Sequence, residues 1–168
     1  RPIIFKTGSA MSIYAQDRVI KRIRKVYDYA FEEQPYPGAP RIIAHQINHK
    51  PFYINGVEVI PVPVVHGQLP ILGFRIGKMA YITDTNLIPV ESLPLLKGLD
   101  VLILDALHHR EHFSHFTLEQ AILQAKEIGA KQTYFIHMSH HMGTHESVEK
   151  QLPRGMNLAY DGLELQFS

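Results

Sequence analysis

The residues of this sequence that could do chemistry stand at the ends of apolar segments. One titratable residue follows each of four largely apolar segments, and these residues are His66, Asp84, Asp105 and His137. In a layered α/β protein, a rigid sheet brings the side chains at its strand ends into one crevice. Imidazole and carboxylate groups without thiolates suit a divalent ion such as Zn²⁺, Mn²⁺ or Fe²⁺. The pattern therefore predicts a metal-binding crevice built from strand ends.

Each of these residues also has a plainer interpretation. An Asp at a strand end often caps a turn, and Asp105 suits that role as well as a role in a site. A single His after a strand is more often a hydrogen-bonded residue than a ligand. His108 and His109 stand beside Arg110 and Glu111, which is typical of a solvated loop. The segment 137–145 holds several histidines that cannot all stay protonated near pH 7, which favours a metal or an anion nearby.

Composition narrows the class of protein. The 168 residues have the length of one domain. The 17 Lys and Arg side chains nearly balance the 16 Asp and Glu, and the formal net charge of +1 disfavours a nucleic-acid partner. The absence of cysteine excludes a disulfide framework, a Cys nucleophile and a thiolate zinc site. No segment approaches the roughly 18 apolar residues of a membrane-spanning helix, so we expect a cytoplasmic protein without a membrane partner.

The elements that must position these residues alternate along the chain. Strands are expected at 11–15, 41–47, 52–54, 57–65, 71–76, 79–83, 101–104 and 133–136, with a closing hairpin at 157–160 and 163–167. Helices are expected at 16–31, 117–128 and 144–151. The helix at 117–128 has the strongest signals, because Thr117 and Gln120 form a capping box and Gly129 follows its last turn. Pro61 and Pro63 place their strand at a sheet edge or end its pairing. The order predicts a mixed sheet with helices outside it.

Five sequence motifs resemble the later motifs of the metallo-β-lactamase-fold hydrolases, and especially the phosphoribosyl cyclic phosphate phosphodiesterase-like branch. In chain order they are Val64-Val65-His66-Gly67, Tyr81-Ile82-Thr83-Asp84-Thr85, Ser114-His115-Phe116-Thr117-Leu118-Glu119, Phe135-Ile136-His137-Met138-Ser139-His140 and Tyr160-Asp161-Gly162-Leu163. The resemblance covers essentially the whole chain. It implies an α/β (α+β) fold, a metallo-β-lactamase-like αββα sandwich with its N-terminal part missing, so that 1–168 is a single domain truncated at its N-terminus.

The resemblance also implies roles for individual residues. His66 would bind the first of two divalent metal ions (Zn or Mn), Asp84 would bridge both and act in catalysis, and His137 would bind the second. His115 would be a catalytic residue that contacts the scissile phosphate or protonates the leaving oxygen. The residues that would orient the ligands through hydrogen bonds are His140, Asp105 and Asp161.

One departure from the family pattern is large. The early motif His-x-His-x-Asp-His, which supplies four site residues in the family, does not occur in this sequence. The sequence also begins with Arg1 rather than Met, which predicts that the motif lies upstream.

The resulting hypothesis is a phosphodiesterase that uses a dinuclear metal centre to activate water on a phosphodiester, a cyclic one included. Its partner would be a small-molecule phosphodiester substrate, and a homodimer is left open. One alternative is the same fold hydrolysing a lactone, thioester or lactam, because the fold does not decide the reaction. The other is an inactive fragment that lacks the early metal-binding motif.

Overall fold

The computed structural model describes residues 6–32, 36 and 38–166. The chain divides into two compact units, Arg1–Lys50 and Pro51–Ser168. All candidate site residues belong to the second unit. The expectation of one domain over 1–168 stays a prediction.

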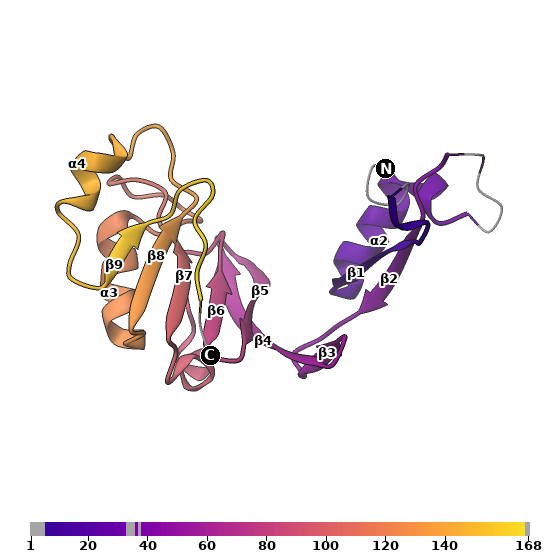
Figure 1. Cartoon of the computed structure of the whole chain (residues 1–168), viewed down its shortest axis with the longest axis horizontal. Coiled ribbons are helices and arrows are strands. Elements are labelled where there is room, and N and C mark those ends of the chain that lie inside the picture. Colours follow the sequence, from indigo (N-terminus) through magenta and orange to yellow (C-terminus); the bar gives the residue numbers. More distant parts are fainter. Residues whose placement is uncertain (1–5, 33–35, 37, 167–168) are drawn as a thin grey trace. The chain divides into compact units, whose positions relative to one another are not determined.

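The first unit contains two parallel strands and a helix. Strand β1 (Met11–Ala15) pairs with β2 (Ile42–Gln46), and helix α2 (Asp17–Val26) connects them (Figure 1). The helix is shorter than the expected 16–31. After Val26 the chain turns into a short 3₁₀ helix, η1 (Asp28–Ala30), where the Asp28 carboxylate accepts a hydrogen bond from the Tyr29 backbone N–H at 2.8 Å. Such a local bond competes with continuation of the α-helix.

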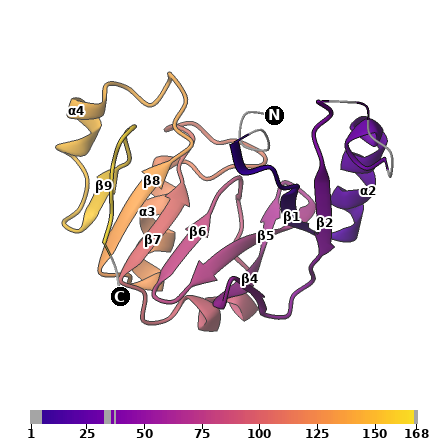
Figure 2. The ribbon, with the colours of Figure 1, turned by 45° about the vertical axis from the view of Figure 1, so that its right-hand side comes forward.

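The second unit is built on one seven-stranded mixed sheet, which confirms the expected sheet type (Figure 2). Its strands lie side by side in chain order: β3 (Phe52–Ile54), β4 (Val57–His66), β5 (Leu69–Ile76), β6 (Met79–Ile82), β7 (Val101–Asp105), β8 (Gln132–Ile136) and β9 (Met156–Leu158). The strands from β3 to β6 pair antiparallel, and those from β6 to β9 pair parallel. The strand containing the two prolines behaves as predicted. Residues 60–66 of β4 pair with β5, whereas β3 pairs only with residues 57–59 of β4. Among the described strands, β4 is therefore paired on one side only at Pro61 and Pro63.

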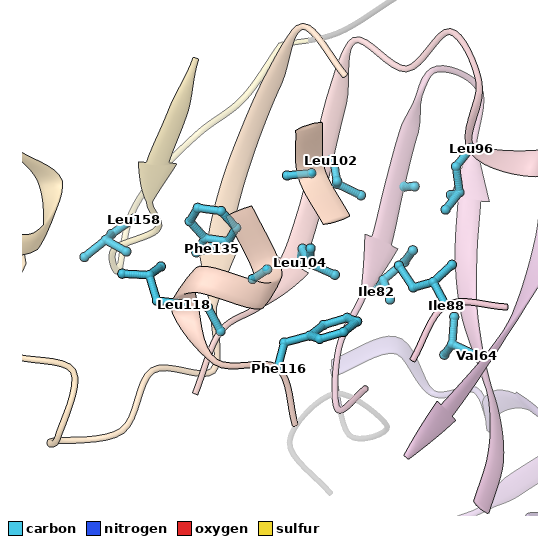
Figure 3. Close-up of a cluster of buried hydrophobic side chains, with 14 of the residues drawn as sticks. Val64, Ile82, Ile88, Leu96, Leu102, Leu104, Phe116, Leu118, Phe135 and Leu158 are labelled. Atoms are coloured by element: carbon cyan, nitrogen blue, oxygen red, sulfur yellow. The ribbon is translucent and has the colours of Figure 1, made fainter. Parts of the chain in front are cut away.

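The hydrophobic core lies on one face of this sheet. Alternate residues of the central strands point to that face, as do residues that follow β6 and precede α3. Figure 3 labels ten of the residues of this core: Val64, Ile82, Ile88, Leu96, Leu102, Leu104, Phe116, Leu118, Phe135 and Leu158. Helix α3 (Leu118–Ile128) and the 3₁₀ helix η2 (Val90–Leu96) contribute to this core. Each fully buried side chain of this size contributes about 1.5–3 kcal/mol, so the sheet and α3 form a firm support for the strand ends.

The ends of α3 are those that the sequence predicts. The Thr117 hydroxyl accepts a hydrogen bond from the Gln120 backbone N–H, and the Gln120 side chain accepts one from the Thr117 N–H. Gly129 closes the helix in the left-handed conformation, with φ of 70°. The last helix, α4 (His145–Glu149), follows Thr144. None of the helices in the described ranges is long and apolar enough to cross a membrane.

The expected closing hairpin is wrong. Strand β9 pairs in parallel with the buried strand β8, in the register Thr133↔Met156. The turn at Asp161–Gly162 forms as expected, but residues 163–166 form no strand, and Phe167 lies outside the described residues. Leu158 is buried beside β8, so burial of β9 at the sheet edge outweighs the local hairpin signal.

Candidate metal centre

The four strand-end residues lie at one edge of the sheet. Strands β6, β7 and β8 run parallel, and β4 has the same direction because two antiparallel steps separate it from β6. His66 ends β4, Asp84 is the second residue after β6, Asp105 ends β7 and His137 directly follows β8. The C-terminal ends of strands are where α/β sheets assemble sites.

The structure brings four of the predicted site residues together. One possible ligand atom from each of His66, Asp84 and His115 lies within 4.8 Å of the others. The Nε2 atom of His137 is 3.4 Å from Oδ1 of Asp84. The ring of His115 stands between those of His66 and His137, at centroid distances of 4.7 and 4.8 Å. His115 is thus close enough to serve as a ligand as well as the predicted catalytic residue.

The hydrogen bond of His66 prepares its ring for metal binding. Nδ1 of His66 is 2.8 Å from the Asp84 carbonyl oxygen, which can only accept. Nδ1 therefore carries the proton, and Nε2 keeps the lone pair that a metal needs.

The residues present fit a divalent ion. Two ligand atoms about 2.0–2.1 Å from a tetrahedral Zn²⁺ stand about 3.3–3.4 Å apart, close to the separation of His137 Nε2 and Asp84 Oδ1. The Thr83 hydroxyl donates to the other carboxylate oxygen of Asp84 at 3.0 Å, which orients the group. The donor set of imidazole and carboxylate is that of Zn²⁺ and Mn²⁺ sites.

Two of these residues have an uncommon backbone conformation. The φ angles of Asp84 and His137 are 57° and 63°, in the left-handed region that favours glycine. This conformation costs an L-residue about 1–2 kcal/mol. Strained backbone of this kind persists where the surrounding structure holds it, often at functional sites. Here the left-handed conformation sets the direction of the Asp84 and His137 side chains just after β6 and β8 end.

Asp105 and His115 form a buried pair. Asp105 is fully buried; its Oδ1 atom accepts a hydrogen bond from the Thr85 N–H at 3.1 Å, and its Oδ2 atom lies 3.5 Å from Nδ1 of His115. Burial raises the pKa of Asp105 to about 7. Burial, with the neighbouring rings of His137 and His66, lowers the pKa of His115 to about 4. His115 is therefore neutral near pH 7, so the contact is not an ion pair. Asp105 therefore contacts a site residue, and its hydrogen bond goes to the backbone after β6, 20 residues away, so its turn-capping role stays a prediction.

The other two predicted site residues lie farther out. The ring of His140 packs on that of His141 at 3.8 Å, and no hydrogen bond joins it to His66, Asp84 or His137 in the described part of the chain. Asp161 lines a cavity of about 230 Å³ together with His137 and Tyr160. The orienting roles of His140 and Asp161 stay predictions.

The sequence did not single out His112. The centroid of the His112 ring lies 5.0 Å from that of the His115 ring and 6.1 Å from that of the His108 ring. The loop before α3 folds back because the Leu118 N–H donates to the His108 carbonyl oxygen at 2.9 Å. The hydrophobic pattern of the sequence does not predict this fold-back. The only signal in the sequence is that His112 stands three residues before His115.

His109 connects two loops of the site. It is exposed, as expected for a solvated loop, but its Nδ1 atom lies 2.9 Å from the Glu119 carboxylate and its Nε2 atom lies 3.1 Å from the Met142 carbonyl oxygen. Both partners can only accept, so both bonds form only when the ring is doubly protonated. The bond to Glu119 raises the pKa of His109.

The strain at His137 predicts the effect of two substitutions. In the metal-free protein, we expect His137→Gly to be about 1 kcal/mol more stable than His137→Ala, because only Ala pays for the left-handed backbone. Thermal denaturation should separate the two variants by about 2–4 °C. The same pair at the exposed Leu123 of α3 is the control, where Gly should be the less stable. Equal melting temperatures at His137 would contradict the strain.

The bonds of His109 predict a pH-dependent stability. Because its pKa is raised in the folded state, the stabilisation is complete below the unfolded pKa of about 6.5 and is lost as the pH rises through the folded pKa. Wild type should therefore melt above His109→Gln at pH 5.5, by a small margin because solvent screens the pair, and the margin should shrink by pH 9. His49→Gln is a control in the other unit. A margin that widens with pH would count against the doubly protonated ring.

Comparison with known proteins places this geometry in a family. A model of the beta-lactamase superfamily domain matches residues 2–138. A crystal structure of a new diphosphatase from the PhnP family superposes with a TM-score of 0.87 at 39% identity, over 96% of this chain and 59% of that chain. The metallo-beta-lactamase fold protein YhfI from Bacillus subtilis superposes with a TM-score of 0.71 at 19% identity, over 95% of this chain and 66% of that one, and shows the fold alone.

A curated relative has a different description. The octanoyltransferase of Porphyromonas gingivalis is 38% identical over 156 residues, which are 92% of this chain but 32% of that protein. This chain thus spans about a third of that relative and about three fifths of the diphosphatase. The family model covers most of the chain and the fold agrees with it, so the chain belongs to the beta-lactamase superfamily and has the metallo-β-lactamase fold.

Proposed function

We propose that the protein is a metal-dependent phosphodiesterase that hydrolyses a small-molecule phosphodiester, a cyclic one included. The observation that carries this proposal is the buried His115, held beside Asp105 and grouped with His66 and Asp84. An imidazole in this position suits the scissile phosphate or the leaving oxygen of a substrate bound at the metal ligands. The similarity to a diphosphatase supports it, because a diphosphatase also breaks a bond to phosphorus.

The metal ions have a defined part in the proposal. When bound, two divalent ions would make water more acidic and offset the charge of the phosphate oxygens. His66, Asp84 and His137 are the residues of this chain that would hold them. Two ions require more ligands than these three side chains, and we assign the others to the family's early histidine motif.

The chain's own residues would bind, orient and move protons. Oδ2 of Asp105 lies 3.5 Å from Nδ1 of His115 without a hydrogen bond between them, so Asp105 flanks the Nδ1 side of the ring and the Nε2 side is left to face the substrate. There the neutral ring would donate a hydrogen bond to a phosphate oxygen, or it would give its Nε2 proton to the leaving oxygen while Nδ1 takes a proton from the Asp105 carboxyl group. The Asp84 carbonyl oxygen fixes the tautomer of His66, and Thr83 orients the Asp84 carboxylate. Asp105 acts through His115 and is therefore a positioning residue.

A second candidate function is hydrolysis or transfer at an acyl bond, such as a thioester, lactone or lactam. The octanoyltransferase relative favours it, since its name describes acyl transfer. This chain matches only a third of that protein, so the name need not describe the matched part. A non-catalytic domain is the remaining alternative.

The proposal predicts distinct effects for three variants. With Mn²⁺ or Zn²⁺, the full-length protein should hydrolyse bis-p-nitrophenyl phosphate and cyclic ribose phosphates, and Asp84→Ala should lose both turnover and bound metal. His115→Ala should lower kcat about 10²–10⁴-fold with metal content unchanged. Asp105→Asn should lower kcat about 10–100-fold, as loss of an orienting partner does. Steady-state kinetics and elemental analysis measure these effects.

The controls separate the alternatives. His49→Gln removes an exposed imidazole from the other unit and should change nothing. Full turnover in Asp84→Ala, or turnover without metal, would overturn the proposal. Faster turnover of an octanoyl thioester than of any diester would establish the acyl candidate, and a protein that binds no metal would establish the non-catalytic one.

A further inference from the structure

The positive charges of this chain are concentrated in its first compact unit. Arg1–Lys50 contains nine Lys and Arg side chains against four Asp and Glu, whereas Pro51–Ser168 contains eight against twelve. The formal charges of the two units are therefore +5 and −4, and the net charge of +1 for the whole chain does not reveal this separation. An excess of one sign on a surface attracts a partner of the opposite sign.

Four of these positive side chains lie on one face of α2. They are Arg18, Lys21, Arg22 and Lys25, which we call the basic face, and all four are exposed. Because they are spaced three and four residues apart, they are neighbours on the helix surface, with Cβ atoms about 5–6 Å apart. From the first to the last the helix rises about 10 Å, since each residue adds about 1.5 Å. The basic face is thus a short, regular array of cations.

The carboxylates near the basic face leave part of its charge unpaired. Asp17 forms an ion pair with Lys21 at 2.7 Å, and both side chains are so exposed that solvent screens the pair. No carboxylate in the described ranges forms an ion pair with Arg22 or Lys25. These two side chains are therefore available to an anionic partner.

The opposite side of α2 argues against a membrane as that partner. It contains Val19, Ile20 and Ile23, of which Ile20 is buried and the other two are half-buried. The helix packs against β2 within the first unit (Figure 2). A helix that binds a membrane surface needs a free apolar face to insert between the lipids. Here the apolar side is used by the fold, so a partner of the basic face is bound through charge.

The regular spacing of the cations suits the backbone of a nucleic acid. A duplex carries one negative charge per about 1.7 Å of its axis, and Lys and Arg neutralise its phosphates whatever the base sequence. The segment 18–25 contains no aromatic residue. The basic face therefore offers no platform on which the bases of a single strand could stack. These features favour the phosphates of a duplex over unpaired bases.

We propose that the basic face binds the phosphate backbone of a nucleic-acid duplex without reading its sequence. Lys21, Arg22 and Lys25 would each contact a phosphate oxygen, and Arg18 would extend the contact by one turn. The small net charge of the chain disfavours such a partner for the molecule as a whole, but not for its first unit. The inference is independent of the proposed function, because all candidate site residues belong to the second unit.

Fluorescence anisotropy with labelled 20-base-pair DNA and RNA duplexes tests the proposal on the full-length protein. For wild type, the logarithm of the binding constant should fall with the logarithm of the salt concentration with a slope of about −3, at about −0.9 for each of three phosphates. The double variant Arg22→Gln/Lys25→Gln should bind about tenfold more weakly and lower the magnitude of the slope by about 1.8. The charge-conserving variant Arg22→Lys/Lys25→Arg should bind like wild type. The control Lys97→Gln/Lys126→Gln, which removes two exposed cations from the other unit, should also bind like wild type.

Several outcomes would overturn the proposal. They are absence of duplex binding, an affinity that Arg22→Gln/Lys25→Gln leaves unchanged, and an equal loss in Lys97→Gln/Lys126→Gln. Tighter binding of a single-stranded 20-mer, or binding only to phosphatidylserine vesicles, would also overturn it. Binding of both duplexes would support contact with phosphates alone, whereas binding of one would identify the source of the partner. Duplex binding without hydrolysis of any diester would support this inference while the proposed function fails.

Discussion

The segment Asp84–Thr85 connects every part of the candidate site, because its backbone leaves β6 in the left-handed conformation. The Asp84 carbonyl oxygen accepts the bond from His66 at the end of β4. The Thr85 N–H binds Asp105 at the end of β7, and the Thr85 carbonyl oxygen accepts the Phe116 N–H at 2.8 Å, next to His115. Thr85 is fully buried, and its hydroxyl also bonds the Val65 carbonyl oxygen. Two residues thus connect the ends of β4 and β7 and the loop before α3.

The candidate site combines residues fixed at strand ends with residues carried on loops. Residues at the strand ends inherit their positions from the sheet, whose core face is packed by α3 and η2. His115 is positioned differently: the capped helix α3 begins three residues after it, and the buried carboxyl group of Asp105 lies beside its ring. The loop before α3 and the loop after β8 are joined by the exposed bonds of His109. Specificity can therefore vary in the loops without disturbing the candidate metal ligands at the strand ends.

The sequence predicted the parts of the site that depend on local pattern. His66, Asp84 and His137 follow apolar strands, so their convergence needed only the correct strand directions. Helix α3 was predicted because its capping box and its terminal glycine are local signals. The contact of Asp105 with His115 and the approach of His112 were not predicted, since both depend on how the loop at 106–116 folds back. The closing hairpin was wrong for a related reason, since a parallel neighbour across the sheet leaves no local signal.

The central claim is that His66 and Asp84 hold a divalent ion through a ring whose tautomer the backbone has already fixed. Anomalous diffraction at the zinc edge from crystals of the full-length protein grown with Zn²⁺ tests this claim most directly. We expect a peak about 2.0–2.1 Å from Nε2 of His66 and about 2.0–2.2 Å from a carboxylate oxygen of Asp84. Zinc bound through Nδ1 of His66, or zinc found only at side chains other than His66 and Asp84, would contradict it.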